Sequence, residues 1–202
     1  MIIWSNTTPS GETAPVSGCE PRGRKRTTPN LLCPMSHIDD EPSLTRMARL
    51  FVYGTLKKGQ PNHSVMTSCT NGIAEFQGQG YTADLYPLVI GGKDNIPYLL
   101  NVPGKGHHVT GEIYSVDDQM LQFLDEFEGC PDMYQRTPVR IEILEWEGKS
   151  SAPEERPAVN SIIECFVYST TTYPPEWINL PYYDNYDSFG KHGLRYNPRE
   201  NR

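Results

Sequence analysis

The sequence predicts an α+β fold with a small, closed or nearly closed, barrel-like sheet and a few flanking helices. From residue 50 onward, short apolar runs recur, and turns such as Gly91-Gly92 and Pro103-Gly104 separate them. Many short strands punctuated in this way are typical of sheets that close on themselves. Strong helical spacing is confined to residues 118–128, so we expect few helices.

Six apolar runs are expected to form strands, at residues 50–53, 86–90, 96–102, 109–116, 136–146 and 162–169. The first is apolar throughout, as in a buried strand. In the fifth, Val139, Ile141 and Ile143 alternate with charged residues, which indicates a strand with one exposed face. Residues 150–160 carry three charges and two prolines, so we expect a loop there.

One helix is well defined by its flanking residues. Asp117 can cap the N-terminus of residues 118–128, since aspartate side chains accept hydrogen bonds from a first helical turn. Gly129 and Pro131 then end it. A second, short helix is expected near Pro61, because proline is accepted in a first helical turn.

The helix places one carboxylate on its apolar face. On a wheel with Met120 at zero and about 100° per residue, an apolar arc is formed by Met120, Leu121, Phe123, Leu124 and Phe127. Glu128 falls at about 80°, within that arc, whereas Asp125 falls at its edge and Glu126 on the far side. Burial would raise the pKa of Glu128 toward neutrality, which suits a general acid or base. The alternative is a helix-end carboxylate that bends into solvent or pairs with an arginine such as Arg136.

A glycine turn, Tyr53-Gly54-Thr55-Leu56, follows the first strand directly. Glycine permits backbone conformations closed to other residues, and successive N–H groups there can form an anion site. Such a site would hold a substrate carboxylate or a developing oxyanion. The alternative is a plain strand-to-loop glycine.

The chain divides into a predicted disordered N-terminal extension, residues 1–46, and a domain at residues 47–202. The extension is rich in proline, serine, threonine, glycine and arginine and lacks apolar periodicity, so it cannot offset its ordering entropy by burial. Its basic run at residues 22–26 fits a solvated charge cluster; a localisation signal or nucleic-acid patch is the alternative.

Charge and composition exclude several function classes. A net charge of −7 argues against a nucleic-acid partner. No run approaches the roughly 18 apolar residues of a membrane span, and no secretory signal is visible. Five cysteines without Cys-x-x-Cys spacing fit reduced thiols in a cytosolic protein. The histidine spacing predicts no metal site, and a monomer is expected.

Several motifs resemble those of one enzyme family. The similarity runs from about residue 48 to the end of the chain and includes Phe51-Val52-Tyr53-Gly54-Thr55-Leu56-Lys57, Gly59-Gln60-Pro61-Asn62-His63, Tyr86-Pro87-Leu88-Val89-Ile90, Phe123-Leu124-Asp125, Phe127-Glu128, Tyr134-Gln135-Arg136-Thr137, Cys165-Phe166-Val167-Tyr168-Ser169 and residues 193–202. In these segments the chain resembles the γ-glutamylamine cyclotransferases. The Tyr-Gly-Thr-Leu motif alone marks only the wider cyclotransferase-like superfamily; the C-terminal segment points to this member.

The resemblance implies a small, mixed, β-barrel-like α+β fold with a cavity. It implies Glu128 as the catalytic acid/base and substrate binding at Tyr53, Gly54, Thr55 and Leu56. It also implies a small-molecule substrate, chiefly ε-(γ-glutamyl)-lysine left by transglutaminase cross-links, converted to 5-oxoproline and lysine. The implied chemistry needs no metal or other cofactor. The alternatives are cyclisation of γ-glutamyl amino acids or glutathione, and a non-catalytic metabolite-binding module.

Overall fold

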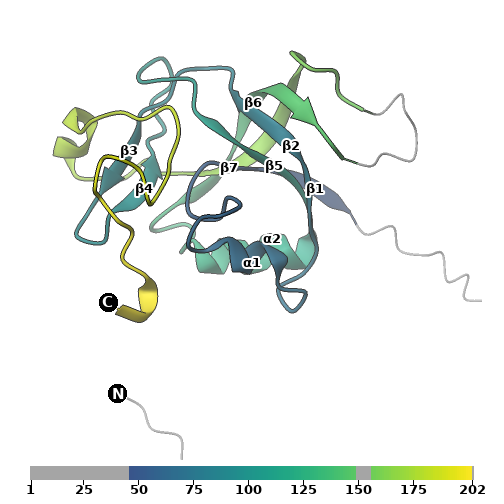
Figure 1. Ribbon diagram of the computed structural model, residues 1–202, viewed down its shortest axis with the longest axis horizontal. Helices are drawn as coiled ribbons and strands as arrows, with labels where there is room; N and C mark the ends of the chain where they lie inside the picture. Colours follow the sequence, from purple (N-terminus) through teal and green to yellow (C-terminus); the bar gives the residue numbers. More distant parts are fainter. Residues whose placement is uncertain (1–45, 149–155, 202) are drawn as a thin grey trace, which may run out of the picture. The chain divides into compact units, whose positions relative to one another are not determined.

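The computed structural model describes residues 46–148 and 156–201. Its centre is a closed five-stranded barrel in the order β1-β5-β2-β6-β7, with a separate two-stranded sheet formed by β3 and β4 (Figure 1). The predicted fold class, a barrel-like α+β sheet with few helices, is therefore confirmed. The expected N-terminal extension lies outside the described residues, apart from its last residue.

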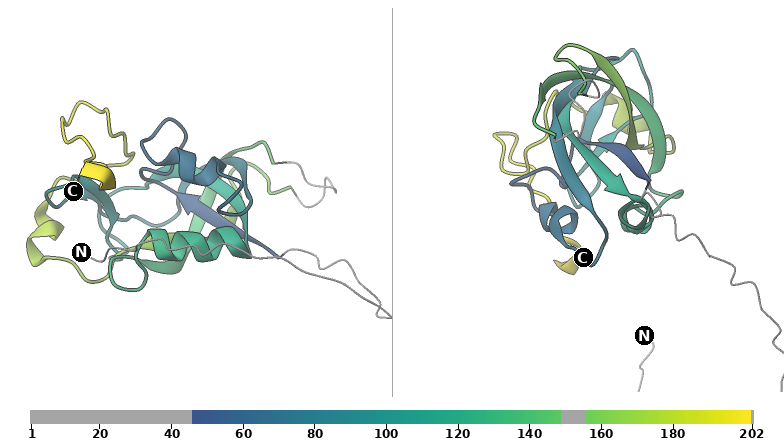
Figure 2. Two further views of the ribbon diagram at one scale, coloured as in Figure 1. Left: turned by 90° about the horizontal axis from the view of Figure 1, so that it is seen from below. Right: turned by 90° about the vertical axis from the view of Figure 1, so that its right-hand side faces the viewer.

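The strands are β1 (Met47–Val52), β2 (Ala74–Thr82), β3 (Leu88–Gly91), β4 (Ile96–Leu99), β5 (Thr110–Asp117), β6 (Gln135–Trp146) and β7 (Ile162–Ser169). Neighbouring barrel strands pair antiparallel, except that β1 meets β7 in parallel, with Leu50 opposite Phe166. That parallel pair closes the ring, as the right-hand view of Figure 2 shows. The sheet is therefore mixed, and all six predicted runs contain strands.

Residues 50–52 of strand β1 are buried on both faces of the sheet, which explains why this part of the strand is apolar throughout. Leu50 and Val52 belong to the core between the barrel wall and helix α2. Phe51 points to the opposite face, into the barrel core with Ile113 and Ile141. Because side chains alternate along a strand, a strand with two covered faces must be apolar at every position.

Strand β2 was missed by the sequence prediction, because two glycines interrupt it. Glycine normally weakens a strand, yet here the barrel requires it. A Cβ on Gly78 would lie 2.2 Å from the Glu145 carbonyl oxygen, and one on Gly80 would lie 2.6 Å from that of Glu142. Register shifts next to both glycines bend the strand around the ring. The two glycines are therefore required for the tight closure of the barrel.

Within residues 46–148 and 156–201, two α-helices flank the barrel: α1 (His63–Thr67) and α2 (Asp118–Phe127). Helix α1 begins just after Pro61, close to its expected position. The Asp117 side chain caps α2 as predicted, accepting a 2.8 Å hydrogen bond from the Met120 backbone N–H. Two 3₁₀ turns, η2 (Pro175–Asn179) and η3 (Arg199–Asn201), lie in the C-terminal part of the chain.

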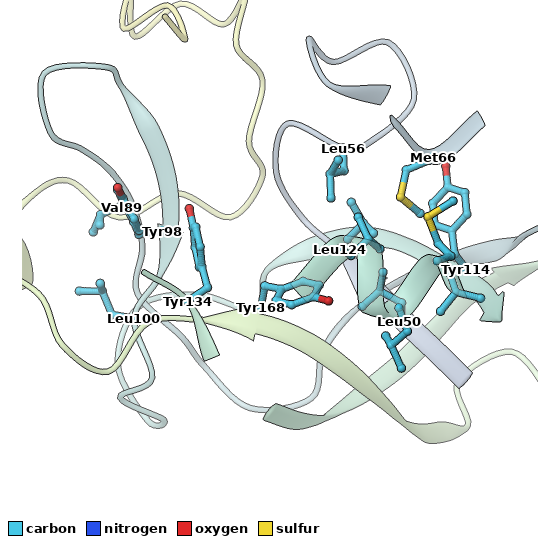
Figure 3. Packing of buried hydrophobic residues seen from close by; sticks show 14 residues of the cluster. Leu50, Leu56, Met66, Val89, Tyr98, Leu100, Tyr114, Leu124, Tyr134 and Tyr168 are labelled. Carbon is cyan, nitrogen blue, oxygen red and sulfur yellow. The ribbon is translucent and has the colours of Figure 1, made fainter. Parts of the chain in front are cut away.

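The core between α2 and the barrel extends toward the β3–β4 sheet. Met120 and Leu124 are fully buried on the α2 side. On the other side the rings of Tyr98 and Tyr134 stack, with centroids 5.3 Å apart. In the view of Figure 3, Tyr168 lies between this aromatic pair and Leu124. This junction between the barrel, α2 and the small sheet is where a cavity opens.

Outside these elements, residues 156–160 form neither helix nor strand, in agreement with the predicted loop, while 149–155 lie outside the described residues. Within the described ranges, none of the helices has the length and apolar character needed to cross a membrane.

Candidate active site

A pocket opens where the end of β1, the end of α2, the start of β4 and the C-terminal tail converge. It holds about 560 Å³ of space, the open mouth included. Its walls are mostly apolar and aromatic, which is usual for small-molecule sites. The lining residues are Phe51, Val52, Tyr53, Gly54, Thr55, Leu56, Asn62, Ile96, Pro97, Phe127, Glu128, Met133, Tyr134, Tyr168, Tyr196 and Arg199. The structure thus brings all five predicted site residues into one pocket.

The end of α2 aims Glu128 into this pocket. Glu128 is the C-cap residue, still in helical conformation, and its N–H donates to the Leu124 carbonyl at 2.8 Å. Gly129 follows with φ +68° and donates to Glu126, while Cys130 donates to Asp125. This pair of hydrogen bonds is a Schellman motif, which ends a helix in a defined geometry. The helix end is therefore ordered rather than frayed, and the Glu128 side chain keeps the direction that the helical wheel assigns.

The surroundings of Glu128 favour its protonated form. Burial raises the pKa of the Glu128 carboxyl from 4.5 to about 7, and the charge of nearby Arg199 lowers that pKa in part. Desolvation dominates because the adjacent walls are apolar and supply little compensation for a charge. A carboxyl with a pKa near neutrality can both accept and return a proton under ordinary conditions.

The alternative pairing of Glu128 with Arg136 is not what the structure shows. Arg136 instead forms an ion pair with Asp125, at 3.2 Å. Asp125 also accepts a 2.8 Å hydrogen bond from the Tyr168 hydroxyl. The neighbouring carboxylate is thus engaged in structural contacts, and Glu128 is left as the acidic group of the pocket.

The turn at residues 53–56 forms another part of the pocket wall. The Tyr53 hydroxyl donates to the Tyr168 carbonyl at 2.8 Å and accepts from the Leu99 N–H at 3.2 Å. Its ring therefore ties three strands together instead of offering a free hydroxyl to a ligand. Burial raises the pKa of Tyr53 far above its ordinary value. Tyr53 faces the pocket, but its hydroxyl serves the fold.

The structural reason expected for Gly54 was wrong. We expected a backbone conformation reserved for glycine, yet its φ is not in the positive range. The restriction is close approach instead: a Cβ on Gly54 would lie 3.0 Å from Cγ of Pro97. Glycine lets the turn lie against β4, so the reason for the residue is packing between two pocket walls.

The backbone of the turn presents free donors. Among the residues that the structure describes, no acceptor pairs with the N–H groups of Gly54, Thr55 or Leu56. The turn itself is fixed, because Asn62 donates to the Thr55 hydroxyl from its side chain and to the Thr55 carbonyl from its backbone. Three successive unpaired N–H groups beside a pocket are suited to an anion or an oxyanion.

Sequence reasoning did not assign a role to much of the pocket wall. Tyr134 and Tyr168 belong to different strand regions, and Tyr196 and Arg199 belong to the C-terminal tail, more than 60 residues beyond Glu128 in sequence. No spacing rule connects such positions. The available signal was the similarity of residues 193–202 to known cyclotransferases, which marked the tail without giving a role to any residue in it.

A barrel whose pocket is lined by one desolvated carboxyl and by a turn with free peptide N–H groups is equipped for proton transfer to and from a bound small molecule. The family model described as "Gamma-glutamyl cyclotransferase, AIG2-like" matches residues 50–187. The chain belongs to this AIG2-like γ-glutamyl cyclotransferase family and is an enzyme.

Individual relatives agree with that assignment. The chain is 61% identical to the γ-glutamylaminecyclotransferase of Rattus norvegicus, over 77% of this chain and 100% of the relative. It is 56% identical to that of Homo sapiens, again over 77% and 100%. The crystal structure of an AIG2-like protein from Mus musculus is 59% identical, with a TM-score of 0.71 and coverage of 78% of this chain and 99% of the other.

Proposed function

We propose that this enzyme cleaves γ-glutamylamines, chiefly ε-(γ-glutamyl)-lysine, to 5-oxoproline and the free amine. The observation that carries the proposal is Glu128, a carboxyl held at the pocket wall by an ordered helix end, with its pKa raised to about 7 by burial. The names of relatives covered along their full length support the substrate class. On this proposal, digestion of transglutaminase cross-links would supply the isopeptide.

The reaction is an intramolecular acyl transfer. Glu128 takes a proton from the glutamyl α-ammonium, and the freed amine attacks the γ-carbonyl carbon, forming the ring C–N bond. As the bond from that carbon to the lysine Nε breaks, Glu128 returns the first proton to the leaving nitrogen. The ring nitrogen still carries one surplus proton, which passes to the departing amine, so the products are neutral 5-oxoproline amide nitrogen and a lysine ammonium. The atoms balance without water or an oxidant. A narrow pocket that bends the glutamyl chain brings amine and carbonyl together, which favours ring closure by proximity.

The N–H groups of Gly54, Thr55 and Leu56 supply the second part of the site. They belong to residues that line the same pocket as Glu128 and have no acceptor in the described part of the chain. In this proposal they bind the glutamyl portion, either at its α-carboxylate or at the oxyanion that forms on the γ-carbonyl. Either use places the reacting carbon between the turn and Glu128.

A second candidate keeps the chemistry and changes the leaving group to an α-amino acid, as in γ-glutamyl-alanine or glutathione. The mostly apolar, aromatic pocket wall favours an unbranched alkylamine, because a carboxylate beside the scissile nitrogen would be desolvated there. Comparing kcat/KM for ε-(γ-glutamyl)-lysine and γ-glutamyl-alanine decides between them. A higher value for γ-glutamyl-alanine would transfer the enzyme to the second candidate.

The cyclisation itself is tested with an N-acetylated substrate. Acetylating the glutamyl α-amine removes the nucleophile, so release of lysine should stop even where the compound still binds. Continued release would indicate hydrolysis instead of cyclisation. We also place the reaction in the cytosol and expect a monomer; the three cysteines of the described ranges are free thiols, as that compartment allows.

A further inference from the structure

Arg199 lines the pocket, but the proton transfer proposed for Glu128 gives it no role. Among the described residues that line the pocket, Arg199 is the only one with a cationic side chain, and Glu128 is the only one with an anionic side chain. Arg199 is exposed, whereas Glu128 is half-buried. The cation therefore lies at the mouth and the carboxyl lies deeper.

The position of Arg199 is fixed by contacts at the end of α2. Its guanidinium carbon lies 4.1 Å from the ring centroid of Phe127, and it donates a hydrogen bond to the Phe127 carbonyl oxygen. Such stacking holds a guanidinium plane in place. The tail that carries it is also tied to the domain, since Asn62 donates to the Tyr196 hydroxyl at 3.0 Å.

The guanidinium still has binding capacity. It carries five N–H donors, and one bond, to a carbonyl, is formed within the described ranges. Arg136 and Arg140 each form an ion pair with an aspartate, whereas no carboxylate of the described residues forms one with Arg199. A planar, stacked guanidinium with free donors is suited to binding a carboxylate through two parallel hydrogen bonds.

The substrate of the proposed function has two carboxylates. The glutamyl carboxylate belongs to the end that must reach the turn at residues 54–56 and Glu128, deep in the pocket. The lysine carboxylate belongs to the leaving group, which must extend toward the mouth. We propose that Arg199 binds the carboxylate of the leaving amino acid and so selects γ-glutamylamines with a carboxylate at the far end of an alkyl chain. This inference rests on the proposed function.

Two matched substrates isolate this contact. γ-Glutamyl-6-aminohexanoate keeps the lysine carbon chain and carboxylate but lacks the α-amine, and γ-glutamylpentylamine lacks both. The quantity measured is the ratio of their kcat/KM values. In the wild-type enzyme the carboxylate should raise the ratio to roughly ten or more, as expected for hydrogen bonds to a charged group. In Arg199→Gln the ratio should fall toward one, and Arg199→Lys should lie between them.

Arg195→Gln is the matched control. Arg195 belongs to the same tail and lies over an aromatic ring, that of Phe189, at 5.1 Å, but it does not line the pocket. Its ratio should equal that of the wild type. Thermal denaturation checks that each variant is folded; where Arg199→Gln does not fold, Arg199→Lys carries the test.

An unchanged ratio in a folded Arg199 variant, or an equal loss on both substrates, would overturn the assignment while leaving the cyclotransferase reaction in place. Failure of the proposed function gives a different result: the wild-type enzyme would release 5-oxoproline from neither substrate.

Discussion

Asp125 and Glu128, two carboxylates at the C-terminal end of α2, lie in different surroundings. Asp125 lies on the barrel side, where it pairs with Arg136 and accepts a hydrogen bond from Tyr168. Glu128 lies on the pocket side, where burial outweighs the influence of Arg199 and raises its pKa to about 7. The two side chains are three residues apart, so the helical wheel separates them by only about 60°, and the partners that each one meets come from other elements.

The difference shows how one helix end serves both fold and chemistry. A paired carboxylate is stable as an anion and changes little with pH near neutrality. A desolvated carboxyl without an ion-pair partner is less stable in its ionised form than in its protonated form. Because the ionised form is unfavourable, it accepts a proton readily near neutral pH. The comparison predicts that mutations at the two positions will affect different properties of the protein.

Removing the pocket carboxyl should have the largest effect. Glu128→Gln keeps the shape of the side chain but cannot take a proton from the substrate, so kcat should fall by roughly 10²–10⁴. The measurement is 5-oxoproline release from ε-(γ-glutamyl)-lysine under saturating substrate. Glu126→Gln, on the exposed side of the same turn, is the control and should retain wild-type turnover. Near-normal turnover in Glu128→Gln would remove Glu128 from the mechanism.

The turn at residues 53–56 should be the next most sensitive position. Gly54→Val would drive a branched side chain into Pro97, which a Cβ alone would already approach to 3.0 Å. The turn and its free N–H groups would shift, and displacements of about 1 Å at such a site can lower rates by roughly 10²-fold. Gly54→Ala should be milder, because one methyl group can be accommodated by a small movement. Equal and normal kcat/KM values in both variants would mean that this turn does not position the substrate.

The raised pKa of Glu128 should also appear in stability. The folded protein binds the Glu128 proton more tightly than the unfolded chain does, so this group lowers stability as pH rises from about 4.5 to about 7. Above pH 7, Glu128→Gln should be more stable than the wild type by on the order of 3 kcal/mol. Below pH 4.5 the two should be equal.

Urea denaturation at pH 5 and pH 8 measures that difference, and the pH dependence of kcat/KM provides an independent check. Because the base must be deprotonated, kcat/KM should decline below a pKa near 7. A stability difference that is constant with pH would show that Glu128 is not desolvated.

Replacing the paired carboxylate should have the smallest effect. Asp125→Asn keeps an oxygen for the Tyr168 hydroxyl but loses the ion pair with Arg136, which is about one-third exposed on both sides. We expect a loss of stability of about 1 kcal/mol or less and a change in turnover of only a few-fold. Thermal denaturation and the same turnover assay measure both. A loss of activity as large as that of Glu128→Gln would show that the two carboxylates act together.

Much of the fold followed from local patterns in the sequence. The apolar runs gave the positions of six strands, and Asp117, Gly129 and Pro131 gave the ends of α2, because these signals depend on neighbouring residues alone. Strand β2 was not predictable in this way. Its glycines are needed for contacts with β6, a strand more than 60 residues away, and long-range packing leaves no mark in local periodicity.

The candidate site likewise contains some features that local sequence predicted and others that it did not. The sequence by itself placed Glu128 on the apolar face of α2, since helical geometry fixes the direction of a side chain from spacing, and it singled out the turn at residues 53–56. Only the tertiary structure decided that Arg136 pairs with Asp125, that Gly54 is required by Pro97, and that Arg199 reaches the same pocket from the C-terminal tail. These facts depend on which distant segments the closed barrel brings together. The burial that raises the pKa of Glu128 arises only when those segments pack around it.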